Sequence, residues 1–513
     1  MSDVPDGFAE RIRDEQGGEI RLLKLPYPYR AALTVCSDTH ATPVPTFEAV
    51  HTLINTRQVI ERGSDAWSRL FQDRAIDERE AWSQGIQGFG LPIADTMWLY
   101  SPQIGVFETF DESQGQPVPH SFEGQDFREI VDQWLRRGWV DALHTPGPGS
   151  ISRKATAAGL EWLRRRPHGQ LKVWVNHSLD KTPTCLEPDE AALLPVVKNI
   201  VKSLMMPLSW VGLGFLGSRL FQQPKPRKFP AQQRGLLWLL SLVSGGSIAW
   251  LLLSLVAGSL RGPLNVAVSS AVFAASVIAL GQMRLSYGQG DNPGSPYYNA
   301  DLVRDFGFRY FWLINSLPGY QTHVSDGLAL PEQSSGGRPS CLRLVRLDDG
   351  ERVLAFGRVY KKSVNAWASI ELVTPEALDK LCAEQGTSIL YTHWTHYPQW
   401  VFGARALDSL EHLRRYHDDG RVWVAPISAI LHYTFVRAFL RYSVRLENGT
   451  RIVDIAGVED PVEGLFVPTL EDLRGISFAC SPGPTEFWLH GKAVDKNALD
   501  VVPSGDAVIA RFR

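Results

Sequence analysis

Polar residues stand at the ends of several short apolar runs in the sequence, and each run has the length and composition of a β-strand. One aspartate together with neutral imidazoles is a common ligand set for a divalent metal such as zinc, with open positions for water and substrate. A further histidine beside such a metal can protonate a leaving group. The residues concerned are Asp38 and His40 after the run 31–36, and His144, His177 and His393 at the ends of the runs 139–144, 171–177 and 388–393.

These side chains can meet if the runs that carry them are parallel strands of one sheet, because the carboxyl ends of parallel strands share an edge. Helix-like and strand-like runs do alternate along the chain. The helical stretch 127–137 precedes the run 139–144, and the stretch 155–166 precedes the run 171–177. This order is typical of a parallel α/β sheet with right-handed crossovers. Six such units favour an irregular (β/α) barrel or a wide open sheet.

Three motifs resemble a known enzyme family. TVCSDTH (34–40), DALHTPG (141–147) and SILYTHW (388–394) are similar to the first, second and last motifs of the NodB-type polysaccharide deacetylases. In that family an aspartate and two histidines hold a metal, and a histidine near the end of the barrel acts as an acid. The resemblance covers about residues 25–430. It implies an irregular (β/α) barrel of the deacetylase type, with Asp38 and His144 as metal ligands and His393 as the acid.

Two positions depart from the family pattern. Ser37 stands where the family has its catalytic base, and the prolines and glycines of 146–149 stand where its second metal histidine follows the first. His177 or His40 could supply the missing ligand; equally, the metal site could be incomplete and the chain catalytically silent. The predicted zinc ligands are therefore Asp38, His40, His144 and His177.

Three further residues are candidates for the same site. Asp95 ends the strand-like run GLPIAD (90–95) and could be the missing base, although helix capping explains it equally well. Arg358 could bind substrate hydroxyls, and Trp312 could stack on a sugar face. Both side chains could instead pack the core.

Two consecutive runs in the middle of the chain, 236–258 and 264–281, contain no charged residue. Each is close to the roughly 20 apolar residues that a helix needs to cross a bilayer. Basic residues lie before the first run and after the second, whereas Arg261 alone lies between them. The positive-inside rule then places both flanking parts on the cytoplasmic side. The sequence thus predicts a transmembrane hairpin in a multi-pass protein of the inner, cytoplasmic membrane, preceded by an interfacial segment at 200–221.

The chain of 513 residues is long enough for about three domains. From residue 436 onward, apolar and polar residues alternate between Asn-Gly and Pro-Gly turns, which predicts an antiparallel β accessory domain. The expected organisation is 1–199 for the first part of the barrel, 200–285 for the interfacial segment, linker and hairpin, 286–435 for the second part of the barrel, and 436–513 for the accessory domain.

Composition limits the possible partners. A net charge of −3 gives no reason to expect a nucleic acid. Sixteen tryptophans are more than a core of this size needs, and surplus aromatic rings often line sugar-binding clefts or lie at membrane interfaces. The five cysteines are scattered and odd in number, which favours a reducing compartment. The polar N-terminus has no apolar core, so no secretory signal is expected.

These observations predict a membrane-anchored, metal-dependent carbohydrate deacetylase, a hydrolase acting on C–N bonds, that removes an acyl substituent from a polysaccharide or lipid-linked glycan. The metal would polarise the acyl carbonyl, and His393 would protonate the departing amine. The alternative is a catalytically inactive, deacetylase-like scaffold subunit of a membrane polysaccharide biosynthesis or export complex, with envelope-polysaccharide assembly proteins as partners. A glycoside hydrolase with paired carboxylates is less favoured, because strand-end glutamates are scarce.

Overall fold

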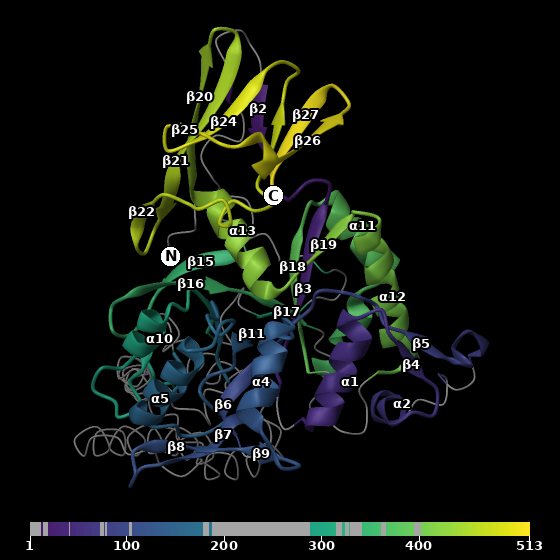
Figure 1. Cartoon of the computed structure of the whole chain (residues 1–513), viewed down its shortest axis with the longest axis vertical. Helices are drawn as coiled ribbons and strands as arrows, with labels where there is room; N and C mark the ends of the chain where they lie inside the picture. Colours follow the sequence, from purple (N-terminus) through teal and green to yellow (C-terminus); the bar gives the residue numbers. More distant parts are fainter. Residues whose placement is uncertain are drawn as a thin grey trace, which may run out of the picture. The chain divides into compact units, whose positions relative to one another are not determined.

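The computed structural model describes residues 12–13 and 19–513, apart from 40–41, 72–75, 77–78, 102–104, 178–183, 187–287, 314–320, 324–327, 329–340, 361–365 and 394–401. The described residues lie in one compact unit made of Met1–Glu187 and Gly288–Arg513. They form a mixed α/β protein with several sheets (Figure 1).

The largest sheet has ten strands along its main path, and their neighbours are parallel except at one end. Its order is β14 (Gln321–His323), β17 (Arg358–Tyr360), β18 (Thr387–Thr392), β3 (Ala31–Ser37), β6 (Asp95–Tyr100), β11 (Val140–Leu143), β12 (Val173–Val175), β13 (Tyr310–Trp312), β16 (Arg352–Phe356) and the antiparallel β15 (Leu342–Arg346). Off this path, β19 (Val422–Val424) pairs with β3, and β7 (Gly105–Asp111) joins β6 to β8 (Gln116–Pro119).

The predicted irregular (β/α) barrel of the deacetylase type is wrong, because the described strands form no closed barrel. Closure needs hydrogen bonds between the two end strands, and among the described strands no pairing joins β14 to β15. At one end, β15 turns back antiparallel on β16, so this edge finishes in a hairpin instead of continuing the parallel order. The parallel core strands between these ends follow the order that alternating helix-like and strand-like runs produce.

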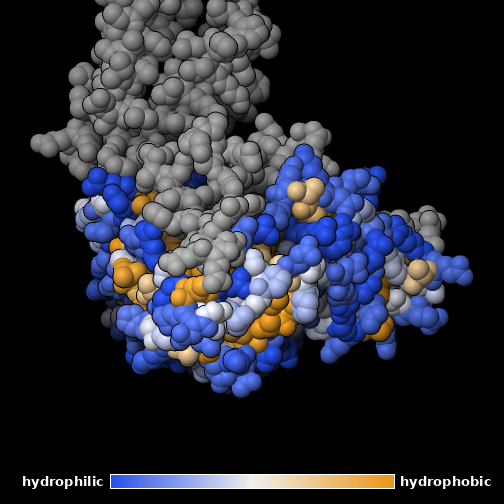
Figure 2. Space-filling view, turned by 90° about the horizontal axis from the view of Figure 1, so that it is seen from above, coloured by the Kyte–Doolittle hydropathy of each residue, from blue (hydrophilic) through white to orange (hydrophobic). Residues whose placement is uncertain are grey.

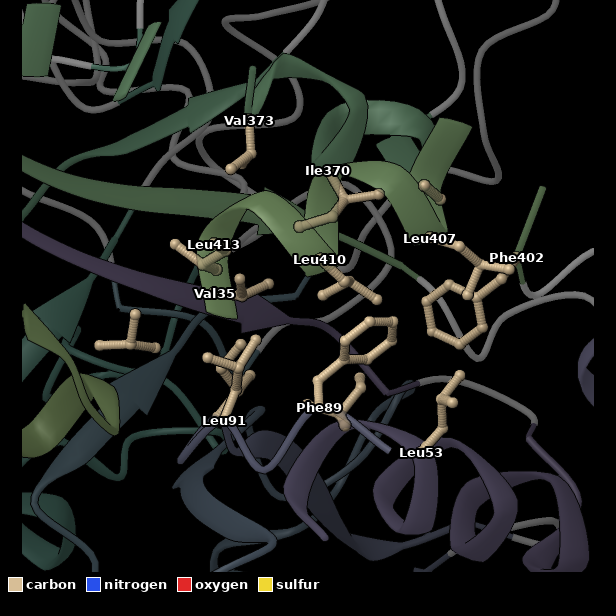
Figure 3. Packing of buried hydrophobic residues seen from close by; sticks show 14 of the residues in the cluster. Val35, Leu53, Phe89, Leu91, Ile370, Val373, Phe402, Leu407, Leu410 and Leu413 are labelled. Atoms are coloured by element: carbon tan, nitrogen blue, oxygen red, sulfur yellow. The ribbon is translucent and has the colours of Figure 1, made fainter. Parts of the chain in front are cut away.

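Helices cover one face of this sheet, which we call the α1 face. Leu33, Val35 and Leu390 point toward it and join a hydrophobic core with residues of α1 and α12. Figure 3 shows this packing, with Phe89 and Leu91 on one side of Val35 and Leu410 and Leu413 on the other. The α-helices of the described residues are α1 (Val44–Asn55), α2 (Asp65–Leu70), α4 (Phe127–Arg136), α5 (Arg153–Arg164), α10 (Ala300–Phe306), α11 (Pro375–Ala383), α12 (Ala404–Asp418) and α13 (Ile427–Phe439).

The opposite face, which we call the α13 face, is covered by α13. This helix contacts β3, β11 and β15 as well as β21 of the C-terminal region (Figure 1). Its core includes Cys36, Val175 and Trp312 from the sheet together with Leu431 and Phe435 from the helix. Because a strand alternates its side chains, neighbours of these residues point to the α1 face.

The C-terminal region forms two five-stranded sheets beyond α13. The boundary predicted at residue 436 falls inside this helix, and the strands begin at Leu440. One sheet contains β20 (Leu440–Glu447), β21 (Thr450–Asp460), β22 (Gly464–Phe466), β24 (Thr485–Leu489) and β25 (Lys492–Ala493). The other contains β23 (Ser477–Cys480), β26 (Leu499–Ser504) and β27 (Ala507–Phe512) with two N-terminal strands, β1 (Ile12–Arg13) and β2 (Glu19–Leu22).

Shorter pieces complete the described chain. Two small antiparallel pairs are β4 (Val59–Glu61) with β5 (Gly85–Gln87) and β9 (Ser121–Phe122) with β10 (Gln125–Asp126). Three 3₁₀ helices span Glu80–Trp82, Ala366–Leu372 and Lys496–Ala498. In the view of Figure 2, hydrophilic residues cover most of the described surface, with hydrophobic patches between them.

The expectation of an inserted transmembrane hairpin, and with it of a multi-pass membrane protein, is corrected. In the described part of the chain, no helix is long and apolar enough to cross a bilayer. The helices there are short and amphipathic; α12, for example, has 15 residues and exposes charged side chains on one side. The runs 236–258 and 264–281, on which the expectation was based, lie outside the described residues.

A carboxylate of β11 caps the first turn of α13. The Ser428 backbone N–H donates to Asp141 Oδ2 at 2.7 Å, and the Ser428 hydroxyl donates to Oδ1 at 2.6 Å. Burial raises the pKa of Asp141 from its ordinary value of 3.8 to about 6, although both hydrogen bonds from Ser428 oppose this rise. The folded protein therefore holds the Asp141 proton more tightly than the unfolded chain does.

This shift predicts how Asp141 affects stability as the pH changes. Its contribution to the free energy of unfolding is largest below pH 4 and is lost as the pH rises through about 6. We expect the Asp141→Asn variant to gain stability relative to the wild type over the same range, because asparagine carries no charge to bury. The gain should be about 1–2 kcal/mol, since Asp141 is only partly buried. Urea denaturation of both proteins between pH 4 and pH 8 measures the difference. A constant difference would contradict the assignment.

Candidate active site

Strand alternation brings the candidate residues to one face of the sheet. Cys36 lies opposite Tyr391, and Val175 lies opposite Trp312. Because side chains two residues apart point the same way, Asp38, His393 and His177 continue the same face beyond the strand ends. His144 follows Ala142 in the same manner, and Ala142 also belongs to the core beneath α13.

Asp38 and Arg358 form a buried ion pair at the centre of this site. Arg358 Nη1 donates to Asp38 Oδ1 at 2.7 Å and Nη2 donates to Oδ2 at 3.2 Å. The Arg358 side chain is 0% exposed and that of Asp38 is 4% exposed. Two parallel N–H···O bonds of this kind fix both groups in one plane and are among the strongest contacts between charged side chains.

Two aromatic rings enclose the guanidinium of this pair. Arg358 Cζ lies 3.5 Å from the ring centroid of Trp312 and 4.1 Å from that of Tyr391. The two rings are nearly parallel, with an interplanar angle of 15° and centroids 6.4 Å apart. Burial opposes the charge of Arg358, but Asp38 and, after it, Cys36 and Tyr391 raise the pKa of the guanidinium above its ordinary value. The arginine therefore stays charged and stays with Asp38.

His144 is the deepest histidine of the site. Its Nδ1 lies 3.2 Å from the carbonyl oxygen of Val175, and Trp98 stacks on its ring at an interplanar angle of 7°. Burial, and then the neighbouring charges of His177 and Arg358, lower the pKa of His144 well below its ordinary value. His144 is therefore neutral at pH 7, with Nδ1 as the donor to Val175.

Two other histidines lie at the edge of the same cluster. The ring of His177 meets that of His144 edge-on, with centroids 5.1 Å apart, and it meets Trp98 in the same way at 5.5 Å. His393 Nε2 lies 3.0 Å from the hydroxyl of Tyr391 and 3.9 Å from Asp38 Oδ2. The His393 side chain keeps 14% of its surface exposed, so it is accessible to a ligand in a way that Arg358 is not.

The structure thus brings together most of the residues that the sequence singles out, but not all of them. Asp95 is the exception. It begins β6 instead of ending a strand, and its register partner is Ser37, so both point to the α1 face. There, Asp95 Oδ2 lies 3.4 Å from His51 Nε2. His40 lies outside the described residues. The members of the cluster on the α13 face are Asp38, His144, His177, Trp312, Arg358 and His393.

The predicted metal-binding site is not evident among the described residues, and zinc itself stays a prediction, since His40 lies outside them. Within the described ranges, no group of three or more His, Cys, Asp and Glu side chains could hold a metal ion. The physical reason lies in Asp38, since both of its oxygens accept hydrogen bonds from Arg358. A cation would have to compete with a guanidinium that is already paired and desolvated. His144 Nε2 lies 3.9 Å from Asp38 Oδ2.

Several residues of the site were not identified from the sequence. Tyr391 could have been found, because it stands two positions before His393 and must share its face. Cys36 has the same relation to Asp38. Trp98 was hidden, because the run that carries it was not recognised as a strand. Outside the site, on the α1 face, His51 of α1 pairs with Asp95 across more than 40 residues, a contact that no local pattern indicates.

No family model matches the chain, and a search of the curated proteins gives no match either. Family evidence for a hydrolase or a deacetylase is therefore absent from these comparisons. The resemblance to the NodB-type deacetylases depends on three short motifs and stays a prediction.

Proposed function

We propose that the chain binds a polysaccharide or glycan through this cluster without hydrolysing it, as a catalytically silent, deacetylase-like subunit that serves polysaccharide biosynthesis or export. The observation that supports this proposal best is the buried bidentate pair between Arg358 and Asp38. The carboxylate that a metal-dependent enzyme would offer to its metal is neutralised here by an arginine of the same chain.

The position of the general base gives further support. Hydrolysis of an amide or ester needs a group that takes a proton from water at the reacting carbon. Ser37 and Asp95, the two positions at which a base could have stood, both point to the α1 face. On the α13 face, Asp38 is held by Arg358 and His144 is buried. The positions of these four residues support a binding role over a catalytic one.

The partly exposed members of the cluster are suited to a carbohydrate. His177, Tyr391 and His393 each keep some surface accessible, whereas Asp38 and His144 are buried beneath them. Imidazole and phenol groups both donate and accept hydrogen bonds, which suits hydroxyl and acetamido groups. Their rings also provide apolar surface for a sugar face. A neutral acetylated oligosaccharide is the ligand class that this combination favours.

The proposal is tested by binding and assay of one ligand on the same protein. Isothermal titration of the full chain with an N-acetylhexosamine tetrasaccharide should give measurable binding, and His393→Ala should weaken it by about tenfold, or about 1.4 kcal/mol. His168→Ala is the matched control, because His168 is an exposed histidine after α5 and should leave the affinity unchanged.

The same preparation separates binding from hydrolysis. Incubation with the tetrasaccharide, with and without added zinc, should release no acetate, and mass spectrometry should find well under one metal ion per chain. Zinc-dependent acetate release that is lost in Asp38→Ala would overturn the proposal in favour of the predicted hydrolase. Absence of any binding, with the fold intact by circular dichroism, would also overturn it.

A further inference from the structure

The buried pair of His51 and Asp95 lies on the α1 face, apart from the cluster around Asp38. Both side chains are 0% exposed. The ring of His51 packs against Phe47, with centroids 4.3 Å apart, and stacks on Trp139 at 5.2 Å. The question that this environment raises is where the protons of the pair are located.

Asn55 fixes one nitrogen of the imidazole. Its Nδ2 donates to the carbonyl oxygens of Leu91 at 2.9 Å and Ile93 at 2.6 Å, so both amide hydrogens are used. The other amide atom, Oδ1, lies 2.7 Å from His51 Nδ1 and can only accept a hydrogen bond. His51 Nδ1 must therefore carry a hydrogen.

The second nitrogen faces a carboxylate. His51 Nε2 lies 3.4 Å from Asp95 Oδ2. With Nδ1 protonated, a neutral imidazole would direct a lone pair at an oxygen that also carries lone pairs, in a site without access to solvent. Such an arrangement costs free energy, and a proton on Nε2 turns the repulsion into an attraction between opposite charges.

The same carboxylate also contacts the end of β3. The hydroxyl of Thr39 donates to Asp95 Oδ2 at 3.4 Å, and the backbone N–H of Thr39 donates to the Thr96 hydroxyl at 3.0 Å. Thr39 directly follows Asp38, whose own N–H donates to the carbonyl oxygen of Thr392. Asp95 thus holds Thr39 on the α1 face at the end of β3, and the neighbouring residue Asp38 points to the opposite, α13 face.

We propose that His51 and Asp95 form a buried imidazolium–carboxylate pair, and that His51 is thereby a positioning residue that holds Asp95 against Thr39 and so fixes the end of β3. Two buried ion pairs then lie on opposite faces of one strand end: Arg358 with Asp38 on the α13 face, and His51 with Asp95 on the α1 face. The effect on ligand binding depends on the proposed function, whereas the protonation of His51 does not.

Nitrogen NMR of the full chain with ¹⁵N-labelled histidine tests the pair. At pH 7.5 the two ring nitrogens of His51, assigned with His51→Gln, should both show attached protons. His144 provides an internal reference in the same spectrum, because it is neutral and should show one ring proton. The isosteric Asp95→Asn change should convert His51 to the neutral form protonated at Nδ1.

The outcomes separate this inference from the function proposed above. A single protonated nitrogen on His51 in the wild type overturns the ion pair. This result is independent of the ligand measurements, and it does not require that the Asp95→Asn variant folds. With the pair established, Asp95→Asn should weaken tetrasaccharide binding by about tenfold, or about 1.4 kcal/mol. An unchanged affinity in a protein that does bind the tetrasaccharide would overturn the positioning role.

Discussion

Replacement of Arg358 by methionine is expected to lower the free energy of unfolding by about 3–5 kcal/mol, because it leaves the carboxylate of Asp38 buried without a partner. Methionine fills a similar volume between Trp312 and Tyr391, so most of the loss comes from the unpaired charge and not from a cavity. Chemical denaturation of the wild type and the variant at pH 7 measures this change.

The double variant tests the reason for that loss. Asp38→Asn alone should also destabilise, since it leaves the guanidinium without its counter-charge. Arg358→Met combined with Asp38→Asn should cost clearly less than the sum of the two single changes, because neither charge then remains. Additive losses would mean that each side chain stabilises the fold by packing alone, and they would contradict a stabilising ion pair between Arg358 and Asp38.

A second large effect is expected from Phe435→Ala in α13, with a loss of about 3–5 kcal/mol. Phe435 is fully buried, and its ring lies 5.3 Å from that of Phe439 and 4.3 Å from the guanidinium carbon of Arg309. It belongs to a core shared by the main sheet and the C-terminal sheets, so its truncation leaves a cavity there.

The matched control for this change is Leu465→Ala on β22. Leu465 is 68% exposed, so its truncation should alter the free energy of unfolding by less than about 0.5 kcal/mol. Urea denaturation followed by tryptophan fluorescence compares the two variants. Equal losses at both positions would contradict the packing described for α13.

Local patterns in the sequence were sufficient to locate the strands that carry Asp38, His144 and His393. The apolar runs before Asp38, His144 and His393 correspond to β3, β11 and β18, because buried parallel strands need continuous apolar stretches. Their alternation also explains why these three residues share a face. The same reasoning failed for Asp95, because one residue of register decides the face and the register of β6 depends on its neighbours.

Contacts between residues far apart in the sequence could not be predicted from local patterns. Arg358 and Asp38 are 320 residues apart in the sequence. Their ion pair, which engages the expected metal ligand Asp38, forms because β17 and β3 belong to one sheet and the two side chains point to the same face. Whether the sheet closes into a barrel could not be predicted from the sequence for a similar reason, since closure depends on the two edge strands and not on the core strands between them. The motifs gave the residue types of a metal site, whereas the fold decided their partners.

The pairing of β2 with β23 has a consequence for how the chain is made. Ile20 lies opposite Cys480 in the register of these strands, so β2 finds its partner strand only after about 460 further residues have been made. At a ribosomal rate of about 5–20 residues per second, this wait is roughly 20–90 s. During that time the apolar edge of β2, with Ile20 and Leu22, has no sheet to join. We expect the synthesis of β23 to set the moment at which this sheet assembles, and the segment around β2 to be a natural place for a chaperone to bind until then.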